Sequence, residues 1–180
     1  MKINENKIIL EHKDYSNNFK RLKKYKDKDY KIISKGTSED IKAFIKAFNE
    51  KDLLKRYSYI YDYMCEYLTN LSCKHCDFKN DMCKANRSGA AIRKENGCCY
   101  FRKEGLCKFL VDKKCTRPNI TCKLFMCPTI EKEVGFSSLP KNYLLLKYFF
   151  NIRQRQLLRY SFRKTKQELL EKLIQKNNNV

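Results

Sequence analysis

The chain has little of what many catalytic centres use. Its 180 residues include 5 glycines, 2 histidines and no tryptophan. So few glycines leave no Gly-rich phosphate-binding loop, and neither Gly-x-Ser-x-Gly nor His-Glu-x-x-His occurs. Two histidines also offer little material for histidine-based acid–base catalysis. These absences argue against the nucleotide-binding, serine-hydrolase and zinc-peptidase classes that such motifs identify.

Long apolar runs are also missing. The longest candidate, residues 143–152, is interrupted by Lys147 and Asn151, whereas a spanning helix needs about 20 apolar residues. Behind the polar start, the run Ile8–Leu10 is too short for the apolar part of a signal peptide. We therefore expect a cytoplasmic protein without a membrane span, whose thiols are kept reduced.

Cysteine is what the chain has in excess. Nine of its 10 cysteines fall within residues 73–127, and the other one is Cys65. Thiols at this density imply disulfides or bound metal, and a reducing compartment favours metal. The predicted metal ligands are the nine clustered cysteines: Cys73, Cys76, Cys83, Cys98, Cys99, Cys107, Cys115, Cys122 and Cys127.

The spacing of these cysteines leaves the kind of metal open. Cys73 and Cys76 form a two-residue-spaced pair, which is typical of the knuckle that holds tetrahedral metal. Cys98 and Cys99 are adjacent, so they more naturally serve different sites, or one binds metal while the other packs. Nine thiols suffice for two four-thiolate sites with one left over, or for one site with structural thiols. Zinc and an iron–sulfur cluster both fit.

Helical patterns lie on both sides of the cysteines. Apolar residues recur at helical spacing in residues 37–72, either as one kinked helix or as two helices, and again in residues 139–176. Thr37 or Ser38 is predicted to cap the first region, and Thr165 opens a capping box in the second. Cys65 lies on the apolar face of the first region, so we predict a buried, inert thiol rather than a ligand.

The expected fold is therefore mainly α-helical, with helices flanking an irregular, metal-organised, cysteine-rich insert. Residues 37–180 are expected to form one domain, preceded by an extension with weak local structure and two short β-like runs. The predicted segments are a basic N-terminal extension (1–36), a helical segment (37–72), a cysteine-rich metal-binding segment (73–128) and a C-terminal helical segment (129–180).

Positive charge suggests an acidic partner. The chain has 40 basic and 20 acidic residues, a net charge of +20, and such a field attracts nucleic acid or another acidic partner. Arg155, Arg159 and Arg163 fall four apart and are predicted to share a helical face. Alternatively, they form a solvated face. The aromatic residues that could stack on bases, or instead fill the core around the metal, are Tyr100, Phe101, Phe109 and Phe125.

Part of the cysteine pattern resembles a known family. The pattern consists of Gly97-Cys98-Cys99, Cys107-Lys108-Phe109-Leu110, Cys115-Thr116-Arg117-Pro118, and Cys122-Lys123-Leu124-Phe125 followed by Cys127. This order resembles the YkgJ-type cysteine-cluster family, which is described as a zinc- or iron-chelating domain and includes relatives of flagellin lysine N-methylase. The resemblance covers roughly residues 73–128 and implies metal binding by these cysteines.

The chain also departs from the family pattern. Cys76 and Cys83 stand further upstream of the double cysteine than the family's opening cysteines do, and Arg117-Pro118 follows Cys115 more closely. The first departure weakens the ligand assignment of Cys73, Cys76 and Cys83. Methylase activity is implied only through the relatives, since the chain has no Gly-rich cofactor loop.

Three functional hypotheses follow. The first is a metal-binding cysteine-cluster protein that holds zinc or an iron–sulfur cluster through thiolates. The second is a basic nucleic-acid-binding protein in which zinc is structural. The third, which rests on the resemblance alone, is an iron–sulfur-dependent protein-modifying enzyme of the lysine N-methylase type.

Overall fold

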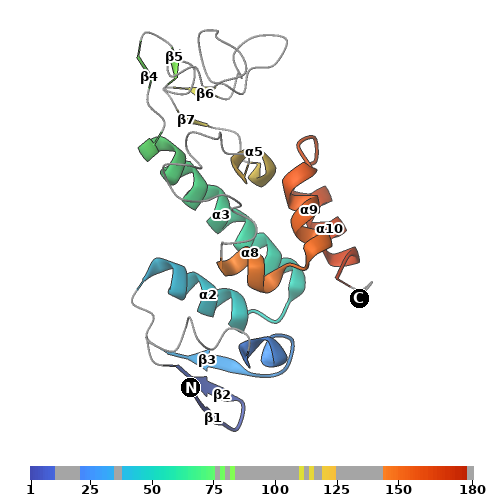
Figure 1. The fold of residues 1–180 in the computed structure, drawn as a ribbon. Helices are drawn as coiled ribbons and strands as arrows, with labels where there is room; N and C mark the ends of the chain where they lie inside the picture. Colours follow the sequence, from blue (N-terminus) through green and yellow to red (C-terminus); the bar gives the residue numbers. More distant parts are fainter. Residues whose placement is uncertain are drawn as a thin grey trace.

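A computed structural model describes nine stretches of the chain: residues 1–10, 21–34, 38–75, 78–79, 82–83, 110–111, 114–115, 119–124 and 144–177. Within them the fold is mainly helical, with a small three-stranded sheet at one end (Figure 1). The predicted mainly α-helical class is therefore confirmed for these residues. The predicted metal-organised insert lies mostly outside them.

A long helix, α3 (Leu53–His75), forms the axis of the fold. It is preceded by α2 (Glu39–Asn49), where the Ser38 hydroxyl accepts a hydrogen bond from the Ile41 N–H at 3.3 Å, as predicted for a cap. Asp52 starts α3, because its Oδ1 accepts the Lys55 N–H at 2.8 Å. Of the two alternatives for this region, the structure therefore has two separate helices.

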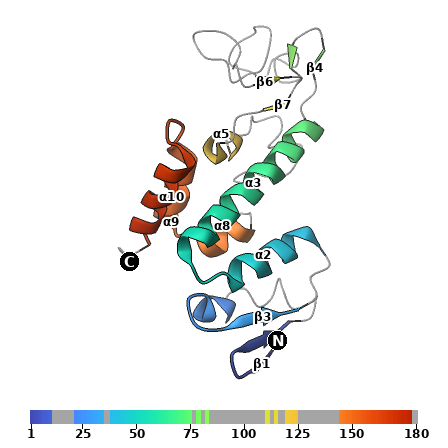
Figure 2. The same ribbon diagram turned by 180° about the vertical axis from the view of Figure 1, so that it is seen from behind.

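The other helices pack around α3. They are α5 (Ile120–Leu124), α8 (Leu144–Phe149), α9 (Ile152–Tyr160) and α10 (Lys166–Gln175). α10 packs on both α9 and α3, and α5 contacts both α3 and α9 (Figures 1 and 2). The predicted capping box at Thr165 is present, and Asn151 forms a second one at the start of α9.

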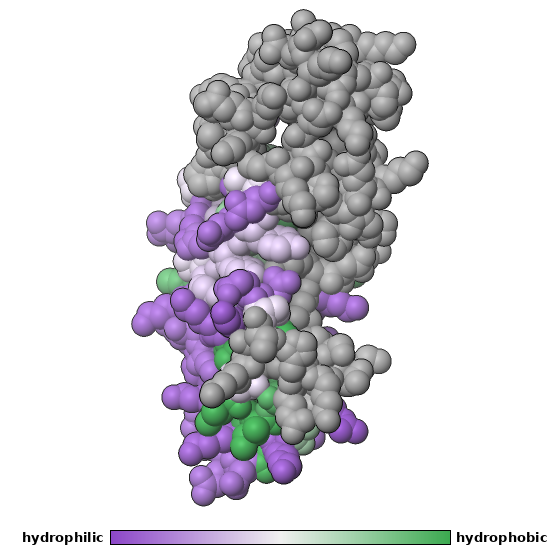
Figure 3. Space-filling view, turned by 90° about the vertical axis from the view of Figure 1, so that its left-hand side faces the viewer, coloured by the Kyte–Doolittle hydropathy of each residue, from purple (hydrophilic) through white to green (hydrophobic). Residues whose placement is uncertain are grey.

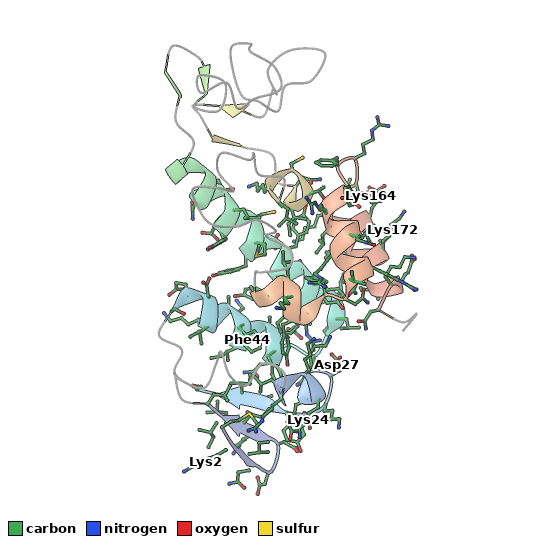
Figure 4. The ribbon with its side chains drawn as sticks, in the orientation of Figure 1. Lys2, Lys24, Asp27, Phe44, Lys164 and Lys172 are labelled. Atoms are coloured by element: carbon green, nitrogen blue, oxygen red, sulfur yellow. The ribbon has the colours of Figure 1, made fainter. Side chains whose placement is uncertain are left out.

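Aromatic side chains fill the core between α2 and α8. Phe44 has no exposed surface, and its ring centroid lies 4.8 Å from that of Tyr148 and 5.6 Å from that of Phe149. Phe48, one turn further along α2, is also fully buried and lies 6.3 Å from Phe44. Such ring pairs combine large apolar burial with favourable edge-to-face geometry. Figure 4 shows Phe44 pointing into this layer.

The described residues before α2 form a small sheet that includes both predicted β-like runs. Strands β1 (Lys2–Asn4), β2 (Lys7–Ile9) and β3 (Lys31–Ile33) form one sheet in that order, with β1 antiparallel and β3 parallel to β2. Ile8 and Ile32 are partners in register and are almost completely buried.

Tertiary contacts hold these short strands in place. Leu22, just before the short helix η2 (Lys23–Tyr25), is fully buried with the sheet. The Asn49 side chain of α2 accepts the Ile32 N–H at 2.7 Å and donates to the Ile32 carbonyl at 3.0 Å. Strands of three residues carry too little local signal to predict such a sheet.

Two minimal hairpins complete the described elements. They pair β4 (Phe78–Lys79) with β5 (Met82–Cys83), and β6 (Leu110–Val111) with β7 (Lys114–Cys115), both antiparallel. β7 packs against α3. Figures 1 and 2 place both hairpins near the carboxyl end of α3, at the opposite end of the molecule from the sheet.

The surface at the sheet end mixes apolar and charged side chains. Ile3, Ile9 and Ile33 are 42–50% exposed. Figure 3 shows apolar side chains at this end among strongly hydrophilic ones. In the stretches that the structure describes, no helix has the length and apolar character needed to cross a bilayer.

Burial of Tyr148 predicts a loss of stability in alkaline solution. Burial, followed by the nearby Asp27 carboxylate, raises the pKa of the Tyr148 hydroxyl well above its usual value, against a smaller opposing effect of Arg56. A tyrosine in the unfolded chain titrates near pH 10. Folding therefore favours the neutral hydroxyl of Tyr148. Its contribution to stability is complete below about pH 10 and is lost as the pH rises from there towards the pKa of the folded protein.

We therefore expect Tyr148→Phe to lose stability less steeply than wild type between about pH 10 and 12. Denaturant unfolding followed by circular dichroism across this range measures the effect. Tyr160→Phe is the matched control, because Tyr160 is 69% exposed. The same pH dependence in both variants would contradict the prediction.

Candidate metal centre

The described elements that carry cysteines are α3, one strand of each hairpin and α5. Cys65 and Cys73 lie on α3 itself, Cys83 on β5, Cys115 on β7 and Cys122 on α5. Side-chain positions are described for Cys65 and Cys122, and backbone positions for the other three. The remaining predicted ligands lie outside the described residues: Cys76, Cys98, Cys99, Cys107 and Cys127.

Each hairpin carries a cysteine at the end of its second strand. Cys83 stands opposite Phe78, and Cys115 stands opposite Leu110. In both hairpins the two strands are joined by two residues, the shortest common hairpin connection. Because β7 packs against α3, the second hairpin brings the backbone of Cys115 close to the helix that carries Cys65 and Cys73.

Cys122 lies on a short helix that tertiary hydrogen bonds hold in place. At its start, the Ile120 N–H donates to the Tyr61 hydroxyl of α3 at 3.2 Å. The Thr121 hydroxyl donates to the Leu158 carbonyl of α9 at 2.6 Å. A five-residue helix is not stable alone, so these bonds fix its position between α3 and α9.

Asn119 adds two further bonds to α5. Its Oδ1 accepts the Cys122 N–H at 3.1 Å, which is an N-terminal cap, and its Nδ2 donates to the Lys164 carbonyl at 3.1 Å. Lys164 lies in the turn between α9 and α10 (Figure 4). The backbone of Cys122 is thus positioned by α3, α9 and this turn together. Ligands held by such surrounding bonds are preorganised for binding.

A lysine connects α5 to the turn of α3 that carries Cys65. The Lys123 ammonium donates to the Cys65 carbonyl at 3.2 Å and also to the Thr69 hydroxyl. Thr69 in turn donates to the Cys65 carbonyl at 2.7 Å. A half-buried positive charge therefore lies beside the Cys65 backbone, where it would offset negative charge on nearby thiolates.

The Tyr61 hydroxyl of α3 has a pKa above its usual value. Burial is the main cause that raises its pKa, the hydrogen bond from the Ile120 N–H opposes it, and the thiols of Cys65 and Cys122 contribute to the increase. The bonds from the Ile120 N–H to Tyr61 and from Lys123 to the Cys65 carbonyl place α5, which carries Cys122, beside the turn of α3 that carries Cys65. The predicted burial of Cys65 is confirmed, at 9% exposure.

These residues fit a soft metal in the chemistry of their donors. Cys65 and Cys122 both carry thiol side chains, which are ligands of zinc and of iron–sulfur clusters. Among the side chains that the structure describes, no three His, Cys, Asp or Glu residues form a metal-binding group. A complete ligand set would therefore have to include predicted cysteines whose side chains lie outside this part of the chain.

The predicted arginine face needs a correction. Arg155 and Arg159 both lie on α9, but the helix ends at Tyr160, so Arg163 lies in the turn beyond it. The capping box of α10 begins at Thr165, and the chain must reverse direction before it. Arg155 is half-buried, whereas Arg159 and Arg163 are exposed. The aromatic residues predicted to stack on bases lie outside the described residues: Tyr100, Phe101, Phe109 and Phe125.

Asn119 gives a direct test of the hydrogen bonds that hold α5. Asn119→Ala removes both the cap and the bond to Lys164, so we expect the free energy of unfolding to fall by about 1–2 kcal/mol. Asn119→Asp keeps the accepting oxygen and should lose less. Urea unfolding measures both, with the exposed Gln156→Ala as control. Equal stability of Asn119→Ala and wild type would contradict this account of α5.

Sequence reasoning missed four residues that shape this site: Tyr61, Asn119, Thr121 and Lys123. One signal was present, because Asn119 follows Pro118 and precedes the apolar Ile120, as an N-cap does. The partners of the other three are 37 to 59 residues away in the chain, and local patterns carry no information on such pairs.

Comparisons with known proteins add no family assignment. No model of a known protein family matches this chain, and no match was found among curated proteins or among solved structures.

Proposed function

We propose that this protein binds zinc or an iron–sulfur cluster through cysteine thiolates of residues 73–127. The observation that supports the proposal most is the convergence of cysteine-bearing elements on α3. β7 and α5, which carry Cys115 and Cys122, both pack against the helix that carries Cys73. Segments separated by tens of residues thus bring cysteine-bearing backbone to one helix.

Charge in the same segment supports the proposal. Residues 73–127 contain 13 basic and 5 acidic residues. Metal-bound thiolates are negative, and a four-thiolate zinc site carries a charge of about −2. Nearby lysines and arginines would offset that charge. One of them, Lys123, lies on α5 next to Cys122 in the sequence. The resemblance to the YkgJ-type family points to the same chemistry.

Metal analysis after anaerobic purification tests the proposal. A brown protein that contains iron and sulfide would identify a cluster, and a colourless protein that contains zinc would identify zinc. We expect Cys73→Ser and Cys122→Ser to lower the metal content. The control is Thr165→Ser, at an exposed position outside residues 73–127. It should leave the metal content unchanged. Native mass spectrometry showing paired cystines and no bound metal would reject the proposal.

The basic end of α9 supports nucleic-acid binding as a second candidate. Tyr160 is 69% exposed, and the Arg159 guanidinium lies 5.9 Å from its ring centroid. Arg153 and Arg163 are exposed nearby in the chain. An exposed aromatic ring among arginines is typical of single-strand stacking sites.

Salt-dependent binding to single-stranded RNA tests this second candidate. We expect Tyr160→Ala and Arg159→Ala to weaken binding more than Lys172→Ala, which removes one positive charge from an exposed position of α10. Negligible RNA affinity of the wild-type protein at low salt would remove nucleic-acid binding as a function.

A further inference from the structure

The three-stranded sheet has one face that turns away from the core. Ile8 and Ile32 are partners in register on its inner face, where both are buried. Because successive side chains of a strand point to opposite faces, the next residues, Ile9 and Ile33, lie on the outer face. They are also partners in register, and they are 46% and 50% exposed. The sheet thus presents a cross-strand pair of isoleucines outside the core.

Lysines occupy most of the other positions on this face. Lys2 of β1 is the register partner of Ile9, and Lys7 of β2 stands directly opposite Lys31 of β3. All three lysines are exposed, and Figure 4 shows Lys2 projecting away from the sheet. The outer sheet face consists of six exposed positions in the three strands: Lys2, Asn4, Lys7, Ile9, Lys31 and Ile33.

The pairing of Lys7 with Lys31 indicates an anionic partner. Like charges directly opposite each other destabilise a sheet, and none of the six positions of the outer sheet face carries a carboxylate. Glu5, the acidic residue of the hairpin, lies in the turn between β1 and β2. A negatively charged partner would remove this repulsion, and the net charge of +20 attracts such a partner to the molecule.

The size and composition of the outer sheet face favour a lipid surface as this partner. Three strands of three residues cover an area only about 10 Å across, whereas a specific protein interface buries roughly 800 Å² on each partner. A second copy of the chain would bring lysines against lysines. Nucleic acid would bind the lysines through its phosphates but leave the isoleucine pair in water. An anionic bilayer accommodates both, because its headgroups bind ammonium groups and its acyl boundary accepts apolar side chains.

We propose that the outer sheet face docks on the surface of an anionic lipid bilayer, with its isoleucine pair entering the headgroup layer and its lysines binding headgroup anions. Such binding is peripheral and reversible, because a few lysines and two half-exposed isoleucines supply far less than a membrane-spanning segment does. The proposal goes beyond metal binding and does not depend on it. The two proposals therefore fail or stand separately.

Cosedimentation with phosphatidylcholine vesicles that contain about 30% phosphatidylserine tests the proposal. Wild type should bind these vesicles, more weakly as the salt concentration rises, and should bind pure phosphatidylcholine vesicles at least about tenfold more weakly. Lys7→Gln/Lys31→Gln should lower the affinity about 25-fold, since each lysine near an anionic surface contributes about fivefold. The matched control is Lys172→Gln/Lys176→Gln, which removes two exposed charges at α10 and should change the affinity less than about threefold.

Two further variants report on the isoleucine pair. Ile9→Thr/Ile33→Thr keeps the β-branched shape and the net charge, and it should lower the affinity at least about fivefold through lost apolar contact. The chain contains no tryptophan, so Ile9→Trp provides a single fluorophore on the outer sheet face. Its emission should shift to shorter wavelength when anionic vesicles are added. Ile152→Trp, at a 63% exposed position of α9, should show no shift. This measurement covers the case in which a double variant fails to fold.

Several outcomes would overturn the proposal. These are no binding of wild type to anionic vesicles at low salt, an equal loss of affinity in Lys172→Gln/Lys176→Gln, or unchanged affinity of Ile9→Thr/Ile33→Thr. Binding of single-stranded RNA that weakens in the Lys7→Gln/Lys31→Gln variant, without vesicle binding, would assign the face to nucleic acid instead. Dimerisation that the threonine variant abolishes would assign it to a second copy of the chain.

Discussion

Replacing Phe44 with alanine is expected to lower the free energy of unfolding by about 3–5 kcal/mol. Phe44 is fully buried and contacts aromatic rings of both α2 and α8. Its removal loses the transfer free energy of the ring and leaves a cavity that rigid neighbours such as Phe149 do not fill. Guanidinium chloride unfolding followed by circular dichroism measures the change.

The control for this variant lies two residues earlier on the same helix. Lys42→Ala removes a long side chain at an exposed position of α2, where its ion pair with Glu39 is worth little. We expect Lys42→Ala to stay within about 0.5 kcal/mol of wild type. A loss below about 1 kcal/mol for Phe44→Ala would show that the layer between α2 and α8 is not a packed core.

The second large effect is expected at a buried arginine. The Arg56 side chain is 1% exposed, and its guanidinium donates to the Asp27 carboxylate at 2.8 Å and to the Glu50 carbonyl at 2.8 Å. Asp27→Ala removes the carboxylate and leaves a buried positive charge. We expect a loss of about 2–3 kcal/mol, less than for a fully buried pair, because Asp27 itself is 58% exposed.

A double variant separates the buried charge from the loss of packing. Asp27→Ala/Arg56→Met replaces the guanidinium by an apolar side chain of similar length beside Phe149. We expect the double variant to recover most of the stability that Asp27→Ala loses, because no buried charge remains. Chemical unfolding of both variants gives the comparison. If the double variant were less stable than Asp27→Ala, the cost would lie in packing and not in the unpaired charge.

Local signals in the sequence predicted the parts of the fold that local chemistry controls. Ser38 and Thr165 cap helices as expected, because each cap needs an oxygen and the N–H groups of the next few residues. Helical spacing also placed Cys65 on a buried face. The end of α9 was missed, since the arginine spacing continues past Tyr160 although the chain turns there.

The features that could not be predicted depend on contacts between residues far apart in the sequence. The sheet joins β2 to β3 in parallel across more than 20 residues of sequence, and no pattern in either short strand specifies that partner. The neighbourhood of Cys65 and Cys122 spans 57 positions in the chain. The sequence therefore supported a list of candidate ligands, whereas the position of α5 beside α3 needed the structure.

The number of residues in the turn between α9 and α10 is constrained by a hydrogen bond to α5. Exposed turns of this kind usually accept inserted residues, and Arg163 within it faces solvent. Here the Lys164 carbonyl is the acceptor for Asn119, so an insertion at residues 162–164 would displace that oxygen and release the start of α5. Homologous chains should therefore keep the length of this turn constant while its side chains vary freely.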